Sequence, residues 1–204
     1  MQKIILTIFI IISVKIYAQN TSNDYYPIEV GYEWKYKEPD KGYEEKYIVN
    51  SFDNTYDAYL AKKIIKLGDK FPITIEELLE KRNGKVLLLG SRGGLLNTDW
   101  EMSSHILMGS NPKVGQSWKN EKEGEIEEYK IIESKEVSVP AGQFEDVLVI
   151  QKIDSSVDSK SKKKKVLMKS KQYYAPNVGL IKTEYYDQDK NVYITFLELV
   201  DYKQ

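Results

Sequence analysis

The sequence predicts a mostly β protein, built as a single strongly curved antiparallel sheet of roughly ten strands with little helix. Runs of β-branched and aromatic residues recur along the chain with turn residues between them, as around Ala175-Pro176-Asn177. The links between these runs are short, which favours antiparallel neighbours, since parallel strands need long crossovers. The 16 tyrosines are typical of strands that bury one face and expose the other to solvent. A sheet of this size curls, so we expect a half-barrel or an open barrel.

Residues 1–18 have the layout of a secretory signal peptide. Lys3 supplies the positive start, Ile4–Val14 is a short apolar run, and Ala18 ends a cleavage site. The alternative is a membrane anchor, but a spanning helix needs about 20 apolar residues, and Lys15 interrupts this run. We therefore expect residues 19–204 to form a single β-rich domain outside the cytoplasm, in the periplasm or secreted, with no membrane span after cleavage.

Composition excludes several kinds of site. The chain has no cysteine, and therefore no disulfide, thiolate nucleophile, cysteine-based metal site or acylation site. We expect a soluble protein that is not lipid-anchored. The full chain has 30 basic and 31 acidic residues, and removing Lys3 and Lys15 leaves 28 against 31, a net charge of −3. That balance argues against a dedicated nucleic-acid binder.

Period-two alternation predicts the strands of the first half. Pro72–Leu89 fits two structures, because Thr74-Ile75-Glu76-Glu77 matches a helix capping box, whereas Asn83-Gly84 between apolar runs favours a hairpin. We favour the hairpin, since Val86–Leu89 resembles a strand that needs a partner. Ser91–Met102 is glycine-rich and polar and predicts a loop. The expected strands are Gly31–Lys37, Glu44–Phe52, Tyr59–Leu67, Ile73–Arg82 and Lys85–Leu89, followed by a short apolar segment at Ile106–Met108.

The second half follows the same design. A turn leads into a strand at Ser117-Trp118, and Ile126–Val139 is long enough to carry a bulge. Phe144–Ile153 pairs back after Pro140-Ala141-Gly142, and Asp154–Lys164 is expected to be a polar, lysine-rich hairpin loop. Lys165–Lys203 then forms a meander, with a turn at Asp187–Lys190 and its last strand at Val192–Val200.

Four phrases carry a resemblance to known proteins. They are Tyr26-Pro27-Ile28-Glu29-Val30-Gly31-Tyr32-Glu33-Trp34-Lys35-Tyr36, Val114-Gly115-Gln116-Ser117-Trp118, Val139-Pro140-Ala141-Gly142-Gln143-Phe144 and Tyr174-Ala175-Pro176-Asn177-Val178-Gly179-Leu180. They resemble, in the same order, a broad set of uncharacterised exported bacterial β-sheet proteins. More distantly, that set is similar to periplasmic lipoprotein carriers of the LolA and LolB type, whose curved sheet encloses an apolar cavity. The resemblance implies a fold and carries over no functional residue.

His105 is the single histidine and therefore the first catalytic candidate. A Ser-His-Asp triad holds its histidine between a nucleophile and a carboxylate. Ser103 and Ser104 lie beside His105 in sequence, and on a strand Ser103 would share its face. Adjacency alone does not orient these groups, so we expect a loop or half-buried surface histidine. A zinc site made of several imidazoles is excluded.

Other polar patterns favour structural roles. Asp187, Asp189, Asn191 and Glu198 have calcium-loop spacing, but Val192 occupies the position where such loops need glycine, so we expect an acidic hairpin turn. The basic run of Lys160 and Lys162–Lys165 fits an anionic surface or, more commonly, a solvated loop. Gly90-Ser91-Arg92-Gly93-Gly94 is expected to be a flexible connection. The pairs Glu44-Glu45, Glu76-Glu77 and Glu127-Glu128 should each point to opposite faces of a strand.

Two aromatic sets fit either a packed core or the lining of a cavity. They are Tyr32, Trp34 and Tyr36, for which we favour the core, and Tyr173, Tyr174, Tyr185 and Tyr186, some of which should face outward. Three functions follow from the sequence. The first is a non-catalytic binding module that holds an apolar small molecule or an envelope protein. The others are an accessory envelope protein with a filled core and, more remotely, a hydrolase. We expect no cofactor and no metal.

Overall fold

The computed structural model describes residues 23–39, 41–94, 97–159 and 161–204, and only the backbone of Asn97 and Thr98. The predicted signal peptide, residues 1–18, lies outside the described residues. In the described part of the chain, no helix is long and apolar enough to cross a membrane.

Twelve strands form one antiparallel sheet, and the described residues contain no helix. In chain order the strands are β1 (Glu33–Lys37), β2 (Tyr43–Asp53), β3 (Ala58–Leu67), β4 (Ile73–Arg82), β5 (Lys85–Gly93), β6 (Asn97–Met108), β7 (Ser117–Lys122), β8 (Glu125–Val139), β9 (Gly142–Val157), β10 (Lys164–Ala175), β11 (Gly179–Asp187) and β12 (Val192–Lys203). The predicted fold class is therefore confirmed, although the strand count exceeds ten.

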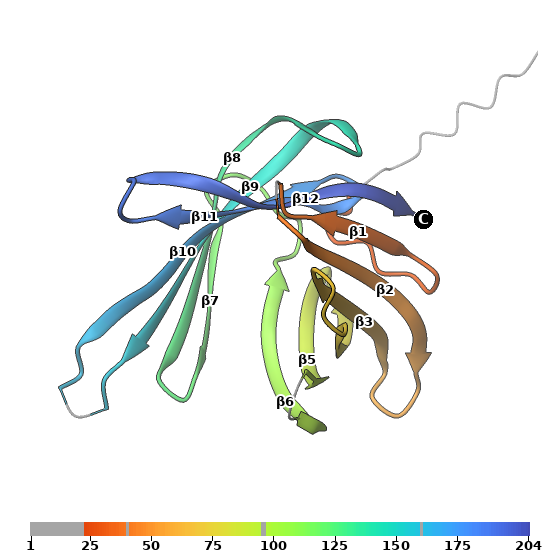
Figure 1. Ribbon diagram of the computed structural model, residues 1–204. Helices are drawn as coiled ribbons and strands as arrows, with labels where there is room; N and C mark the ends of the chain where they lie inside the picture. Colours follow the sequence, from red (N-terminus) through yellow and green to blue (C-terminus); the bar gives the residue numbers. More distant parts are fainter. Residues whose placement is uncertain (1–22, 40, 95–96, 160) are drawn as a thin grey trace, which may run out of the picture.

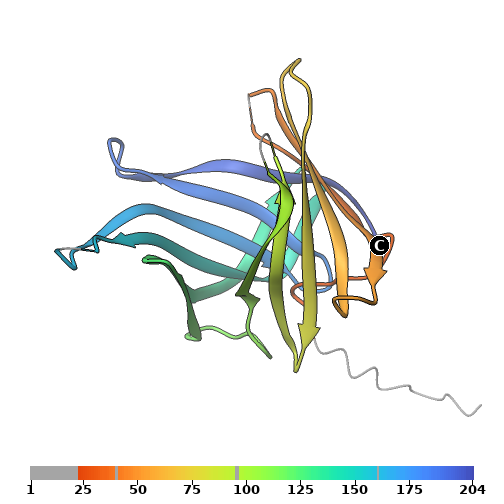
Figure 2. The same cartoon turned by 90° about the horizontal axis from the view of Figure 1, so that it is seen from below.

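The sheet consists of two six-stranded meanders, β1–β6 and β7–β12, joined where β1 pairs with β12 (Figure 1). The strand order is β6-β5-β4-β3-β2-β1-β12-β11-β10-β9-β8-β7, so β6 and β7 are the two edges. Strong curvature brings these edges toward each other, and the sheet nearly closes into a barrel. In the second view the two meanders run in clearly different directions around a shared interior (Figure 2).

Alternation places many of the core residues on the concave side of the strands. Trp34 and Tyr36 on β1 are buried, whereas Lys35 between them is exposed and forms an ion pair with Asp201 on β12. One buried cluster extends from these rings through both meanders, including Leu79 on β4 and Ile150 on β9. A single layer of sheet therefore encloses its own core.

Both ends of the described chain are fastened at Asn177, in the turn between β10 and β11. The Asp24 backbone N–H donates to Asn177 Oδ1 at 3.1 Å, and the Asn177 N–H donates to the Asp24 carbonyl at 2.6 Å. The Gln204 side-chain amide donates to the Asn177 carbonyl at 2.6 Å. Asn177 has a φ of 60°, a left-handed conformation that asparagine tolerates well.

The Pro72–Leu89 segment is a hairpin, as favoured, with β4 and β5 joined at Asn83 (φ 53°) and Gly84 (φ 73°). Positive φ at both central residues is the signature of a tight hairpin turn. The bulge expected in Ile126–Val139 is present as well, because β8 shifts register between Ile131 and Glu133 and again between Lys135 and Val137.

One predicted loop is wrong and another is too long. Ser91–Met102 is mostly strand, since β5 continues to Gly93 and β6 begins at Asn97. The hairpin connection predicted at Asp154–Lys164 is present but shorter, because β9 runs to Val157 and β10 begins at Lys164. Both segments lie near the open end of the curved sheet, where polar side chains meet solvent. Their strands therefore lack the apolar alternation from which a strand is recognised.

Gly93 occupies a position that no other residue fits. Its φ is 108°, and a Cβ there would lie 2.4 Å from the Thr74 carbonyl oxygen. We expect Gly93→Ala to lower the free energy of unfolding by about 2 kcal/mol or more, because it adds a backbone clash to a disfavoured conformation. Urea unfolding measures this loss. Gly109→Ala is the control, since its Cβ would meet no atom within 4 Å, and an equal loss in both variants would contradict the expectation.

Candidate functional site

A cavity of about 190 Å³ lies inside the curved sheet, between the two meanders. Its lining is mostly apolar and aromatic and comes from segments far apart in the chain. The lining includes Tyr26, Trp34, Tyr47, Leu79, Leu88 and Tyr174. Tyr26 stacks on Tyr174 with ring centroids 5.9 Å apart. The first and last of the four phrases quoted above therefore meet in three dimensions at this cavity.

Two aromatic side chains of β1 are fixed at the cavity by hydrogen bonds. Trp34 Nε1 donates to the Val178 carbonyl at 2.7 Å, and the Tyr36 hydroxyl donates to the Leu180 carbonyl at 3.0 Å. Gly179, between these two acceptors, packs against Pro27. The polar atoms of both rings are thereby satisfied, and the rings present apolar surface to the cavity.

A charged cluster forms part of the same lining. Lys63 Nζ lies 3.7 Å from Glu77 and 3.9 Å from Glu45, and the Tyr47 hydroxyl donates to Glu77 at 2.8 Å. Burial lowers the pKa of Lys63, but the two carboxylates outweigh burial and leave that pKa raised. Burial and the adjacent Glu77 raise the pKa of Tyr47 well above its ordinary value. Tyr47 therefore remains a neutral hydrogen-bond donor.

The edges of the sheet, β6 and β7, are joined through side chains. The Ile106 backbone N–H donates to Asn120 Oδ1 at 2.9 Å, and Asn120 Nδ2 donates back to the Ile106 carbonyl at 3.1 Å. Trp118 Nε1 donates to the same carbonyl at 3.0 Å and stacks on Tyr129. The Asn120 amide thus takes the place of one residue of a neighbouring strand. We call this line of side-chain contacts between the edges β6 and β7 the seam.

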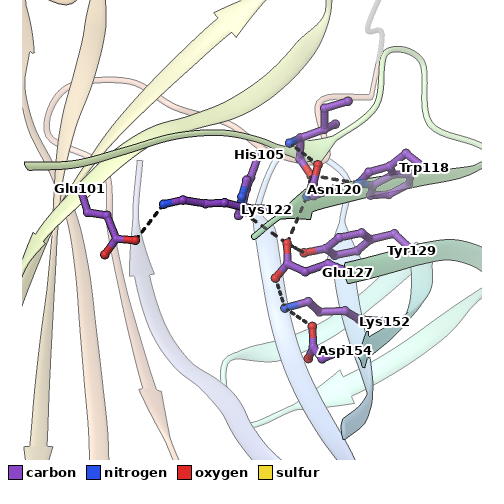
Figure 3. Close-up of polar contacts among 10 residues, drawn as sticks. Glu101, His105, Trp118, Asn120, Lys122, Glu127, Tyr129, Lys152 and Asp154 are labelled. Atoms are coloured by element: carbon purple, nitrogen blue, oxygen red, sulfur yellow. Dashed lines mark hydrogen bonds and ion pairs between the residues drawn. The ribbon is translucent and has the colours of Figure 1, made fainter. Parts of the chain in front are cut away.

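A polar pocket of about 380 Å³ opens along this seam, and Glu127 on β8 is its centre (Figure 3). Glu127 accepts hydrogen bonds from Asn120 Nδ2 at 3.1 Å and from the Tyr129 hydroxyl at 3.2 Å. It lies 2.7 Å from Lys152 Nζ and 3.5 Å from His105 Nδ1. Lys152 also pairs with Asp154 at 3.0 Å.

The ion pair at the centre of this pocket keeps both partners charged. Burial raises the pKa of Glu127, but the hydrogen bond and charge of Lys152, with the bonds from Asn120 and Tyr129, leave it lowered. Burial lowers the pKa of Lys152, and Glu127 and Asp154 together leave it raised. The pocket therefore carries fixed charges of both signs beside the apolar cavity. Leu88 lines both spaces, so they adjoin.

His105 lies in the polar pocket, on β6, and its carboxylate neighbour is Glu127. Ser103 lines the same pocket, as expected for a residue two positions away on a strand, whereas Ser104 is exposed. His105 is neither on a loop nor fully exposed. The predicted half-buried position is correct.

The remaining sequence candidates are placed as follows. Asp187 Oδ1 accepts the backbone N–H groups of Asp189 and Lys190 in the β11–β12 turn, whereas Glu198 pairs with Lys182. Within the described residues no group of three or more acidic or histidine side chains is arranged to hold a metal ion. Most of the glycine-rich segment Gly90–Gly94 belongs to β5, so its assignment as a flexible connection is wrong.

Each adjacent glutamate pair does face both ways. Glu45, Glu77 and Glu127 line the interior spaces, whereas Glu44, Glu76 and Glu128 pair with Lys37, Arg92 and Lys164. In the second aromatic set Tyr174 lines the cavity. Tyr173 points away from it but is not exposed, because Lys135 and Lys182 lie over its ring.

The sequence did not predict that three residues, Asn120, Glu127 and Lys152, would line an internal pocket. The position of Lys152 in the sequence could have indicated this role. Lys152 lies two residues after Val147–Ile150, a run of four apolar residues that are all buried on β9. A charge at the end of such a run needs an internal partner. Glu127 was noticed only as half of a pair. Nothing in the sequence distinguishes Asn120 from a residue of a solvated edge strand.

Comparison with known proteins supports the fold. The profile of the DUF3108-like family matches residues 106–196, somewhat less than half of the chain. Among curated proteins none matches significantly. The similarity to the DUF3108-like family thus covers most of the second meander together with the end of β6.

Two crystal structures share the architecture. One is a candidate lipoprotein of Parabacteroides distasonis ATCC 8503, with 18% identity, a TM-score of 0.56, and coverage of 89% of this chain and 99% of the other. The second is a candidate exported protein with a YmcC-like fold from Bacteroides fragilis NCTC 9343, with 14% identity, a TM-score of 0.59, and coverage of 89% and 100%. At such identities the likeness concerns the fold. Neither is described as a carrier of the LolA or LolB type, and that resemblance stays a prediction.

Asn120→Leu tests the side-chain seam. The variant keeps the approximate volume but leaves the Ile106 N–H without its side-chain acceptor, and it removes one of the donors to the Ile106 carbonyl and to Glu127. We expect the free energy of unfolding to fall by about 2–4 kcal/mol, because buried polar groups lose their hydrogen bonds. The Ile106 amide should also exchange its hydrogen faster. Asn54→Leu in the exposed β2–β3 turn is the control, and unchanged exchange at Ile106 would refute the closing role of Asn120.

Lys152→Met tests the ion pair through its pH dependence. Glu127 has a pKa below its ordinary value of 4.5, so its pairing stabilises the fold above that value. This stabilisation is lost as the pH falls through the lowered pKa. The stability gap between wild type and Lys152→Met should therefore shrink as the pH falls from about 6 to about 3, as measured by urea unfolding. Lys119→Met, which breaks the exposed pair with Glu121, should show little change at any pH.

Proposed function

We propose that this chain is an exported, non-catalytic binding protein whose curved sheet holds a small apolar or amphiphilic molecule. The observation that carries the proposal is the pair of adjoining internal spaces. An apolar, aromatic cavity of about 190 Å³ meets a charged pocket of about 380 Å³ at Leu88. Natural ligand sites combine a mostly apolar lining with a few fixed polar groups, and this arrangement has both.

The volumes limit the ligand. A cavity of about 150 Å³ accommodates benzene, whereas sites for drug-sized ligands occupy about 300–1,000 Å³. The apolar space therefore suits one ring or a short branched chain. The polar end of the same molecule would lie beside Glu127 and Lys152, in the pocket along the seam. A bulky lipid with two acyl chains exceeds the apolar space as it stands.

A binding role accounts for the polar groups better than catalysis does. Glu127 has four partners, which hold it in place and charged. A hydrolase remains the remote alternative, because Ser103 and His105 share the pocket. Broad esterase and glycosidase screens test it. Turnover that disappears in His105→Ala would overturn the non-catalytic assignment.

The proposed location is outside the cytoplasm, with the chain soluble and not lipid-anchored. The signal-peptide layout of residues 1–18 and the absence of cysteine support this. The descriptions of the two similar structures, a candidate lipoprotein and a candidate exported protein, support export in general. A lipid anchor is the point on which this chain and the first of them would differ.

The competing function is an accessory envelope protein with a filled core and no ligand. The small volume of the apolar cavity favours it, since buried side chains occupy most of the interior. Native mass spectrometry of protein recovered gently from its own compartment separates the two. An additional mass that stays bound supports the binding role, and a clean apo mass favours the accessory role.

Leu88→Trp tests the cavity directly. Leu88 lines both spaces, so an indole at this position should occupy part of the volume that the probe needs. We expect the wild type to bind toluene, a neutral single-ring probe of the size that the apolar space suits, as measured by isothermal titration calorimetry. Its binding to Leu88→Trp should be at least about tenfold weaker, a loss of about 1.4 kcal/mol.

Leu87→Trp is the matched control, because Leu87 is the neighbouring residue on the opposite face of β5 and lies outside the lining. It should bind the probe as the wild type does. Equal binding by all three proteins would place the probe elsewhere. The cavity would then no longer support the binding role.

A further inference from the structure

The tip of the β9–β10 hairpin is the most basic segment of the chain. Residues 157–169 contain six lysines and one acidic residue, Asp158, although the chain as a whole has a net charge of −1. Within the hairpin turn the Lys162 N–H donates to the Asp158 carbonyl, and the Asp158 N–H donates to the Lys163 carbonyl. These backbone bonds span the turn, and Lys162 and Lys163 are exposed.

Among the lysines of this segment that the structure describes, most form no ion pair with a carboxylate. Lys164 forms an ion pair with Glu128 at 2.5 Å. Among the described residues, Lys162, Lys163 and Lys165 take part in no ion pair, in contrast with the many lysines that do so elsewhere on the sheet. Their charges remain available to an external anion.

Three consecutive apolar side chains follow the lysines. Val166, Leu167 and Met168 are 39%, 52% and 46% exposed. A register shift between Val166 and Met168 leaves Leu167 without a paired residue on β9, so the strand bulges here. Single exposed apolar residues are ordinary, but three in succession beside a basic run form a distinct surface.

We propose that this tip, residues 161–169, docks the protein on an anionic lipid surface. The unpaired lysines would contact lipid phosphates, and the side chains of Val166–Met168 would enter the interfacial layer. Basic and apolar groups together are the combination that holds peripheral proteins at such surfaces. The hairpin projects from the body of the sheet in both views, which leaves it free to approach a plane (Figures 1 and 2).

Leu167 connects the proposed docking surface with the polar pocket. Leu167 also lines the polar pocket along the β6–β7 seam. A membrane that receives this side chain therefore lies beside the opening of that pocket. The inference goes beyond the proposed ligand function and does not depend on it, because an empty barrel would dock equally well.

The test measures binding of the exported, processed chain to vesicles. Phosphatidylcholine vesicles containing about one third phosphatidylglycerol should bind it at low salt, and pure phosphatidylcholine vesicles should bind it far less. Lys162→Gln/Lys163→Gln/Lys165→Gln should bind the anionic vesicles about a hundredfold more weakly, since each lysine near such a surface contributes roughly a factor of five. Leu167→Ser/Met168→Ser should also bind more weakly but keep the salt dependence of the wild type, because its lysines remain.

Matched controls separate this site from general charge and exposure. Lys70→Gln/Lys85→Gln/Lys113→Gln removes the same charge from exposed lysines elsewhere, and Phe71→Ser removes a side chain that is 96% exposed. Both should bind as the wild type does. Because the chain has no cysteine, a polarity-sensitive dye can be placed through Leu167→Cys or Phe71→Cys alone.

The dye should shift to the blue with anionic vesicles only at position 167. Equal losses in the lysine triple variant and its control would overturn the proposal, because the attraction would then be general. Binding that inorganic phosphate or single-stranded DNA abolishes, with no dye shift, would also overturn it in favour of an anion site without lipid insertion. Probe binding in the cavity is read out separately, so either proposal can fail alone.

Discussion

The pairing of β1 with β12 is the constraint on which the rest of the structure depends. It is the only ladder that joins the two meanders in the described part of the sheet, and β1 is just five residues long. Such a short strand would hold weakly through backbone bonds alone. Trp34 and Tyr36 strengthen it, because their polar atoms bond to carbonyls at the start of β11 and the turn before it. The same two rings line the apolar cavity, so the contact that joins the halves also shapes the interior.

Side chains complete the closure that the backbone leaves unfinished. A fully closed barrel satisfies every edge through strand pairing, but in the described part of the sheet β6 and β7 approach without a ladder between them. Asn120 offers Ile106 an acceptor and a donor, as a residue of a neighbouring strand would. Because Asn120 also donates to Glu127, the closure of the sheet and the charge arrangement of the polar pocket are coupled. A change at the seam therefore alters the pocket.

The sequence predicts local features well and long-range ones poorly. Alternation and turn chemistry identify the β class, the antiparallel pairing and the Asn83-Gly84 hairpin, because these depend on neighbours in the chain. The joining of β1 to β12 pairs residues from opposite ends of the described chain, such as Glu33 and Lys203, and no local pattern records it. The interior charged residues were not predicted from the sequence for a related reason. Glu127 and Lys152 look like ordinary strand residues until the curl of the sheet makes their face an interior one, and the strands at the open end, such as β6, look polar enough to be loops.

Both ends of the described chain are hydrogen-bonded to Asn177, so the fold does not require the polypeptide to begin before β1 and end after β12. Asp24 and Gln204 bond to the same residue, so a short linker could connect the two ends. If the chain were then opened in the segment between β6 and β7, the strands would follow one another in sequence as they do in space, from β7 through β12 and β1 to β6. Such a circular permutant would be one uninterrupted up-and-down ribbon. The natural protein has the same strand order in space, but its described ends lie at β1 and β12 in the middle of the sheet and not at the edges β7 and β6.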